Sequence, residues 1–234
     1  METPDAASPP APIRVFVVED QTKILKNQLK LLEGHPELSI VGTALSGETG
    51  LEEVRRLKPD VLLLDLGLPR MSGIDVTRVV KAELPQIEIL IFTIFDEEDK
   101  VLEAVKAGAS GYLLKGTPAD KMVEAIKEVH QGGTVIQPSL ARRLLKHFRV
   151  GEVPPAAGPT GQQQREPEGK KLSARETEIL QLIAKGVSNS EAATMLTLSK
   201  ATIRTHLEHI YRKLEVSNRV EAVTEGLRKG LIQM

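Results

Sequence analysis

Residues 61–73 read VLLLDLGLPRMSG, and this stretch decides the fold of the first half of the chain. Its apolar run ends at Asp65 and is typical of a strand buried on both faces, as in a parallel sheet. Similar runs alternate with amphipathic stretches of helical length. The apolar runs cover residues 13–18, 38–44, 61–64, 87–94 and 111–114, and the amphipathic stretches lie near 21–33, 47–57, 72–84, 97–108 and 118–131. This order predicts an α/β domain with a five-stranded, parallel, doubly wound sheet.

The composition of the 234 residues restricts the class of protein. Charged residues make up 27% and hydrophobic residues 41%, which is typical of a globular chain and excludes disorder throughout. The absence of cysteine excludes disulfides, a thiolate nucleophile and a zinc site built on sulfur. The first residues do not have the pattern of a signal peptide, and no apolar run is long enough to span a membrane. We therefore expect a cytoplasmic protein without a membrane segment.

A change of composition near residue 149 indicates a second domain. Residues 149–171 are rich in Pro, Gly and Gln and offer almost nothing to bury, so they predict a flexible linker. After the linker no strand pattern occurs, and Ser173, Ser188, Ser199 and Asn218 are candidate helix N-caps. We predict a disordered tail over 1–12, the α/β domain over 13–131, a helical extension over 132–148, the linker over 149–171 and a small all-α domain over 172–234.

Acidic residues follow two of the predicted strands. Glu19 and Asp20 come directly after the first apolar run, and Asp65 follows the third. In an open parallel sheet of this order, ligands bind beyond the carboxyl ends of the first and third strands. Carboxylates so close together call for a cation, and an all-oxygen site with few protein ligands suits Mg²⁺. The fourth run delivers Thr93 and the fifth is followed by Lys115, and both could hold phosphoryl oxygens at the same edge.

Each of these residues has an ordinary structural explanation when taken alone. Acids often end strands or cap helices, and Lys115 could be a solvated surface lysine. All five together at the strand ends of one sheet favour a functional site. Its chemistry would be attack of a carboxylate on phosphorus, with a metal ion neutralising the developing charge.

The motifs VVED (17–20), VLLLDLGLPRMSG (61–73), IFTIFDEED (91–99) and GASGYLLKG (108–116) resemble the receiver domains of two-component response regulators. The resemblance covers residues 13 to about 131. It implies that Asp65 is the phosphoacceptor and that Glu19, Asp20, Asp65 and the backbone carbonyl of Gly67 hold Mg²⁺. It also implies that Thr93 and Tyr112 are the switch residues and that Lys115 binds the phosphoryl group. The pair Glu19-Asp20 departs from the Asp-Asp pair of many members.

The second predicted domain contains an amphipathic helix suited to a DNA groove. Ile203, Leu207, Ile210 and Leu214 repeat at spacings that place them on one buried stripe. A shorter helix precedes it, so the pair is spaced as a helix-turn-helix with the second helix reading DNA. From Lys170 onward the chain has 11 basic and 7 acidic residues, which suits an anionic partner. Charge alone would equally fit a solvated helix face or a docking module. The candidate DNA contacts are Lys200, Thr202, Arg204, Thr205, Glu208, Arg212 and Lys213.

Residues 172–223 resemble the LuxR-type helix-turn-helix, and the whole chain resembles a NarL/FixJ-type response regulator. The resemblance implies a transcription factor that is phosphorylated by a sensor histidine kinase, binds double-stranded DNA and forms a homodimer when active. RNA polymerase is a candidate further partner. Arg204, Thr205 and Glu208 fall where the family contacts bases, although an acid at 208 departs from the common pattern. The last helix, residues 219–229, matches the family's dimer interface and would otherwise be ordinary core.

Two other functions stay open at this level. One is an aspartyl-phosphate phosphatase, but such enzymes usually have a second acid two residues after the nucleophile, where this chain has Gly67. The other is a regulator independent of phosphorylation, or a receiver that only docks a protein. We expect no enzyme activity beyond slow self-dephosphorylation.

Overall fold

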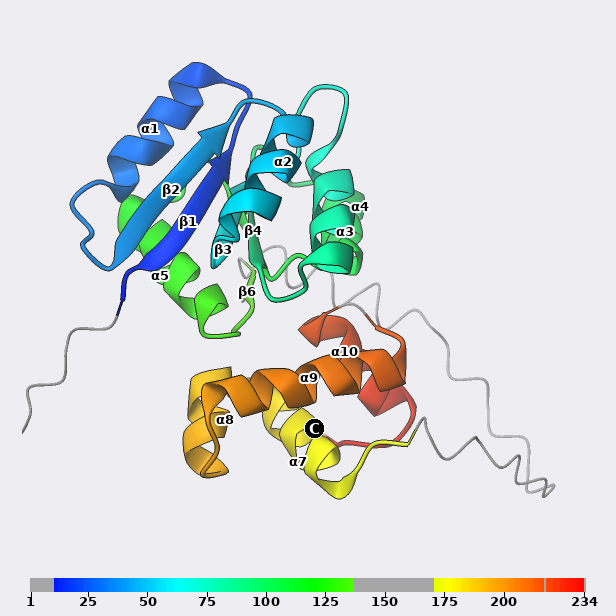
Figure 1. Cartoon of the computed structure of the whole chain (residues 1–234). Helices are drawn as coiled ribbons and strands as arrows, with labels where there is room; N and C mark the ends of the chain where they lie inside the picture. The colour runs from blue at the N-terminus through cyan, green and yellow to red at the C-terminus, as the bar shows by residue number, and fades with distance from the viewer. Residues whose placement is uncertain (1–10, 137–170, 217, 234) are drawn as a thin grey trace, which may run out of the picture.

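A computed structural model describes residues 11–136, 171–216 and 218–233. The predicted tail up to residue 10, the predicted helical extension from residue 137 and the predicted linker up to residue 170 lie outside the described residues. The described chain forms an α/β domain followed by an all-helical domain, as predicted (Figure 1). No helix within the described ranges is both long and apolar enough to cross a membrane.

The α/β domain is built on one parallel sheet with the strand order β2-β1-β3-β4-β5-β6. Helices α1 and α5 cover one face, and α2, α3 and α4 cover the other (Figure 1). The strands are β1 Ile13–Val18, β2 Leu38–Ala44, β3 Val61–Leu64, β4 Glu88–Thr93, β5 Gly111–Leu114 and β6 Val135–Ile136. The helices of this domain are α1 Thr22–Leu32, α2 Gly47–Leu57, α3 Gly73–Glu83, α4 Glu98–Ala107 and α5 Ala119–His130.

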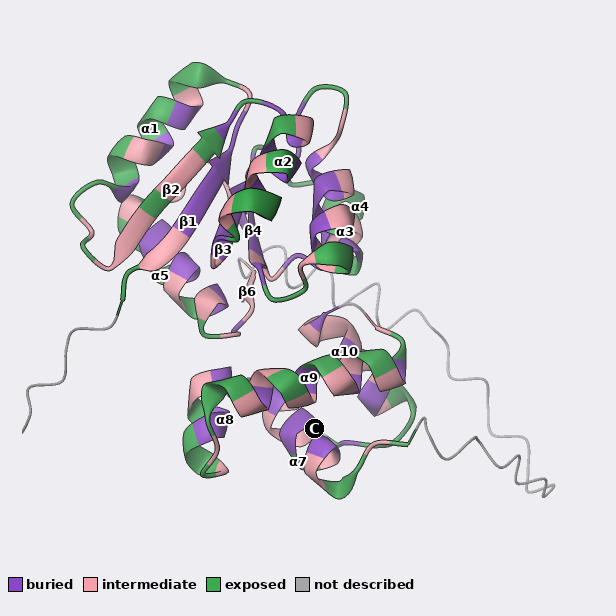
Figure 2. Cartoon of the chain, viewed as in Figure 1, coloured by how far each residue is buried: buried purple, intermediate pink, exposed green. Residues whose placement is uncertain are grey.

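The central strands are apolar along their length because both faces of the sheet are covered. In β1, Val15 and Val17 pack on the side of α1 and α5, whereas Phe16 and Val18 pack on the opposite side. All four side chains are buried, and Figure 2 shows the same burial for β3 and β4. Charged groups therefore enter these segments only where a strand ends, which concentrates them at the two edges of the sheet.

The sixth strand adds to the five that the sequence pattern predicts. Val135 and Ile136, which lie in the predicted helical extension, pair instead with Gly111 and Tyr112 of β5. Gly132, just before them, has φ of +82°, a left-handed conformation that ends α5 and redirects the chain. The two β-branched residues that follow the turn then extend the sheet.

The second domain consists of α7 Ala174–Ala184, α8 Asn189–Met195, α9 Lys200–Leu214 and α10 Arg219–Arg228. All four predicted N-caps are confirmed. Ser173 and Ser188 form reciprocal capping boxes with the glutamates three residues on, while Ser199 and Asn218 accept from the backbone N–H groups of Thr202 and Glu221. These caps stabilise the starts of short helices that lack a sheet to pack on.

The helical domain lies at the amino ends of the strands, opposite the edge where β1 and β3 end (Figure 1). Asn218 donates to the carbonyl of Val105 at 2.6 Å, and the carbonyl of Gln131 accepts from the backbone N–H of Asn189 at 3.1 Å. Arg219 donates to the carbonyl of Gly132 at 2.8 Å. The ends of α4 and α5 therefore form the surface that receives α8 and α10.

Candidate functional site

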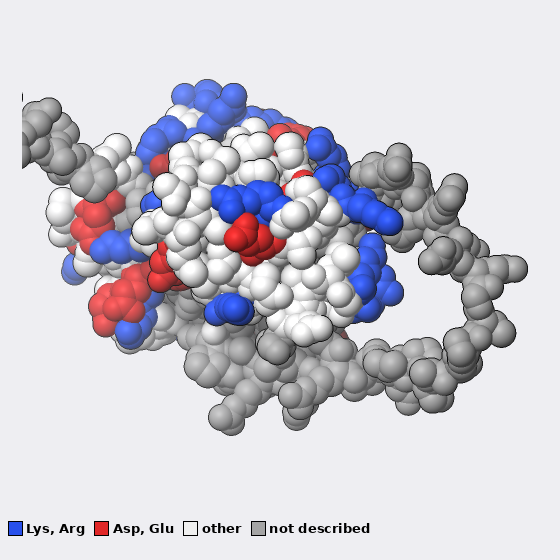
Figure 3. Space-filling model, turned by 90° about the horizontal axis from the view of Figure 1, so that it is seen from below, with Lys and Arg blue, Asp and Glu red and all other residues white. Residues whose placement is uncertain are grey.

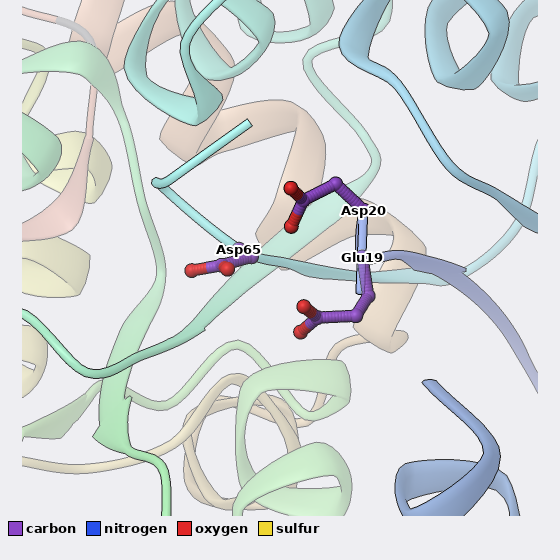
Figure 4. Close-up of side chains that lie close together, drawn as sticks. All are labelled: Glu19, Asp20 and Asp65. Carbon is purple, nitrogen blue, oxygen red and sulfur yellow. The ribbon is translucent and has the colours of Figure 1, made fainter. Parts of the chain in front are cut away.

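Three carboxylates meet where β1 and β3 end. These strands are neighbours, and Val18 is in register with Leu64, so the residues that follow them emerge at the same level. Glu19, Asp20 and Asp65 each place a carboxylate oxygen within 4.8 Å of the others. Figure 4 shows the three side chains facing a common space. The convergence predicted for these acids is therefore present.

Lys115 joins two of the three acids. Its Nζ lies 2.7 Å from Oδ2 of Asp65 and 2.7 Å from Oε2 of Glu19. Its backbone N–H donates to the carbonyl of Thr93, which extends the pairing of β4 with β5 and directs the side chain to this edge. Burial alone would lower the pKa of Lys115, but the hydrogen bonds to Asp65 and Glu19 outweigh it and raise the pKa. The ammonium is therefore firmly charged at neutral pH.

Glu19 is the most buried of the three acids, with no exposed surface. Burial is the largest influence on this carboxyl and raises its pKa, and the neighbouring charge of Asp65 acts in the same direction. Lys115 opposes both. The hydrogen bonds from Lys115 and from the backbone of Gln21 thus oppose the effect of burial on the pKa of Glu19.

Three buried oxygen atoms of the site have no partner among the described residues: Oδ1 of Asp20, Oδ1 of Asp65 and Oγ1 of Thr93. Buried polar atoms are normally hydrogen-bonded, so unpartnered ones point to a missing ligand. Two of them are carboxylate oxygens, the ligand type that Mg²⁺ prefers, and the third is a hydroxyl that can donate to a phosphoryl oxygen. The residues therefore fit a metal ion and a phosphoryl group side by side.

Gly67 and Phe95 form one wall beside Asp65. A Cβ on Gly67 would lie 3.2 Å from the Phe95 ring, a tight contact, and at an ordinary 3.6 Å from Oδ2 of Asp65. The Tyr112 hydroxyl donates to the carbonyl of Phe95 at 2.8 Å. Tyr112 is fully buried here, and burial raises the pKa of its hydroxyl. The ring therefore lies inside the receiver core.

Helix α9 has the amphipathic surfaces that the sequence predicts for it. Its apolar stripe, Ile203, Leu207, Ile210 and Leu214, is buried against α7 and α8. On the outside, Lys200, Thr205, Glu208 and Arg212 are exposed. Figure 3 views the end of the molecule where this domain lies, and basic side chains stand mainly around the rim of a largely uncharged face. The face seen in Figure 3 therefore carries no continuous basic patch among the described residues.

Comparison with known proteins covers both domains. The model of the response regulator receiver domain matches residues 15–127, and that of the luxR family of bacterial regulatory proteins matches residues 170–225. The chain is 33% identical over 228 residues to the transcriptional regulatory protein DegU of Brevibacillus brevis, across 95% of this chain and 96% of that one. The chain is a two-component response regulator.

Other relatives of the regulator agree. The response regulator VraR of Staphylococcus aureus is 32% identical over 225 residues, which is 94% of this chain and 99% of its own. The response regulator ChrA of a heme-sensing two-component system, known from a crystal structure, has 33% sequence identity to this chain. The match covers 95% of this chain and 100% of ChrA, with a TM-score of 0.50. The regulator is therefore a transcriptional regulatory protein with a receiver domain and a LuxR-type helix-turn-helix.

Three of the residues predicted to contact DNA, Lys213, Thr202 and Arg204, have partners within the protein. Lys213 Nζ lies 2.7 Å from Oε2 of Glu176, the buried capping residue of α7. The Thr202 hydroxyl lies 2.8 Å from the Ser199 hydroxyl at the start of α9. Arg204 approaches the receiver, where its guanidinium lies 3.9 Å from Oε1 of Glu88. Each of these three residues therefore has a contact within the protein.

Two residues that sequence reasoning missed take part in these arrangements. Gln28 of α1 donates from Nε2 to Oε2 of Glu19 at 2.9 Å, although the acid lies nine positions earlier. Glu88 opens β4 and faces Arg204 across the two domains. A glutamine on the buried face of a helix was the available signal for Gln28. Nothing in the sequence pairs Glu88 with Arg204, because their contact depends on how the domains dock.

Proposed function

We propose that Asp65 accepts a phosphoryl group from a sensor histidine kinase and that this controls DNA binding by the helix-turn-helix. The observation that carries the proposal is the group of unpartnered buried oxygens of Asp20, Asp65 and Thr93 around one acid. A structural cluster of charges would satisfy these atoms internally.

The reaction follows from the positions of the side chains. A carboxylate oxygen of Asp65 attacks the phosphorus, the bond to the kinase's phosphohistidine nitrogen breaks, and its electron pair remains on the imidazole. Glu19, Asp20, Asp65 and the carbonyl of Gly67 would hold Mg²⁺, which neutralises charge on the transferring group. The Thr93 hydroxyl donates to one phosphoryl oxygen. Lys115 pairs with another, so the acyl phosphate replaces the present ion pair with Asp65.

The contact between the receiver and the helical domain is the step that phosphorylation would control. Arg204 and Glu208 line a crevice together with Lys81, Pro85 and Glu88 of the receiver. Val220 of α10 packs against the receiver core. We propose that phosphorylation weakens this contact, which frees α9 for double-stranded DNA and α10 for a homodimer. RNA polymerase would then be recruited or blocked at the operator.

The test is intact mass after incubation with Mg²⁺ and a small phosphodonor. Wild type should gain one phosphoryl group, whereas Asp65→Asn should gain none, and chelator should abolish the adduct on wild type. Slow return to the unmodified mass would match the expected self-dephosphorylation, and multiple turnover of a phosphomonoester would instead favour a phosphatase. If wild type gains no adduct with donor or with any cognate kinase, the proposal is wrong.

The second measurement is operator binding by fluorescence anisotropy, with and without phosphodonor. The dissociation constant of wild type should fall on phosphorylation, and that of Asp65→Asn should not change. An operator affinity indifferent to phosphodonor, despite a complete adduct, would favour a regulator independent of phosphorylation.

A further inference from the structure

Gln28 is a buried amide on an otherwise apolar face of α1. It shares this face with Leu25 and Leu32, and only 3% of the residue is exposed. The apolar neighbours pack into the core between α1 and the sheet. A leucine or methionine would suit the position by the amphipathic pattern, so the amide needs another explanation.

The contacts of the amide point to one role. Nε2 donates to Oε2 of Glu19 at 2.9 Å, while Oε1 is buried and has no partner among the described residues. Leaving one end of a buried amide unsatisfied lowers stability. The bond to Glu19 is therefore what the side chain provides, and core packing does not account for it.

The Glu19 carboxylate has one fixed side-chain donor besides Lys115. Its Oε2 accepts from both Gln28 and Lys115, and its Oε1 accepts from the backbone N–H of Gln21 at 3.3 Å. Lys115 is shared with Asp65 and, under the proposed function, follows the phosphoryl group. Glu19 would then keep Mg²⁺ as its cation but lose one of the donors that orient its carboxylate. Gln28, fixed in a helix, stays in place.

We propose that Gln28 is a positioning residue that orients the Glu19 carboxylate for Mg²⁺ and keeps it oriented when Lys115 moves. This inference rests on the proposed function. A neutral donor suits the role, because a cation here would compete with the metal and an acid would repel Glu19. Partners of metal ligands that act in this way typically change metal affinity by about 10–100-fold when they are removed.

The experiment compares Gln28→Met with wild type. Methionine keeps the length and the burial of the side chain and removes the donor. Gln86→Met makes the same chemical change on an exposed turn far from the acids and serves as the matched control. Mg²⁺ is titrated alone, and binding is followed as the rise in the melting temperature by circular dichroism. In parallel, the Mg²⁺ dependence of the phosphoryl adduct is followed by intact mass.

For Gln28→Met we expect the half-effect concentration of Mg²⁺ to rise about tenfold or more in both measurements. The adduct at saturating Mg²⁺ should still form, and the melting temperature in chelator should match or exceed that of wild type. Gln86→Met should behave as wild type. Equal Mg²⁺ dependence of Gln28→Met and wild type would overturn the inference while leaving the proposed function intact. A wild type that neither binds Mg²⁺ nor forms the adduct would overturn both.

A double-mutant cycle keeps the test decisive if Gln28→Met is less stable. Glu19→Asp withdraws the carboxylate from Gln28 by one methylene. If the amide acts through Glu19, adding Gln28→Met to Glu19→Asp should not raise the Mg²⁺ requirement further. Independent, multiplicative effects of the two changes would contradict the inference.

Discussion

The carboxyl ends and the amino ends of the receiver strands, called here the carboxyl edge and the amino edge, differ in how their charged residues are paired. At the carboxyl edge, Glu19 and Asp65 are almost wholly buried, share one lysine, and leave oxygens unpartnered beside them. At the amino edge, Glu88 is partly exposed and already bonded to Lys81 and Ser110, and Arg204 reaches it only at 3.9 Å. The first edge is arranged for a ligand that must come from outside. The second is a weak contact that another partner can replace.

The largest expected effect comes from removing the cation of the carboxyl edge. Lys115→Met deletes two charge-assisted hydrogen bonds, each worth about 1.5–3 kcal/mol in such settings. The phosphoryl group on Asp65 would lose its ammonium partner. It binds that ammonium more strongly than the unphosphorylated Asp65 carboxylate does. We expect the stimulation of operator binding by phosphodonor to fall by about 100-fold or to vanish, as measured by anisotropy.

The adduct itself should still be detectable by mass in Lys115→Met, which separates chemistry from signalling. Full stimulation of DNA binding in this variant would show that Lys115 does not couple the two edges. Lys121→Met is a suitable control, since this exposed lysine pairs only with Glu124 among the contacts described.

A smaller effect is expected on the recognition helix. If Arg204 reads a guanine edge, Arg204→Ala should cost about 1–3 kcal/mol on the operator and little on random DNA. Lys200→Ala should instead weaken both alike and lower the salt slope by about 1, as a phosphate contact does. Titrations of phosphorylated protein with operator and scrambled duplexes measure both. An equal loss on both duplexes for Arg204→Ala would argue against base readout.

The smallest effect tests the amino edge directly. Glu88→Gln keeps a hydrogen-bond acceptor for Ser110 and Lys81 but removes the charge that faces Arg204. Partly exposed ion pairs are worth about 1 kcal/mol at most, so operator affinity of the unphosphorylated protein should tighten by no more than about fivefold.

Glu83→Gln makes the same change of net charge where the acid pairs with Arg55, away from α9. It should leave DNA binding unchanged. A larger gain for Glu88→Gln than for phosphorylation itself would mean that this pair, and not the carboxyl edge, dominates the switch.

Much of the first domain could be predicted because its signals are local. The run Val61–Leu64 forms β3 with the predicted bounds, and the glycine and serine at 72–73 begin α3 as expected. The five acidic, hydroxyl and basic site residues converge because strand ends in a parallel sheet share one edge. The turn after α5 was harder. Its glycines redirect the chain into β6, and a strand of only two residues is too short for a periodic pattern to predict.

The sequence by itself determined the two folds, the family and the cluster of Glu19, Asp20, Asp65, Thr93 and Lys115, because apolar periodicity and strand-end position are properties of neighbours in the chain. Only the tertiary structure decided that Gln28 reaches Glu19, that Tyr112 is already buried, that Lys213 pairs with Glu176, and that Arg204 faces Glu88. These pairs join distant elements, and their distances depend on packing angles and domain docking that short-range patterns do not encode.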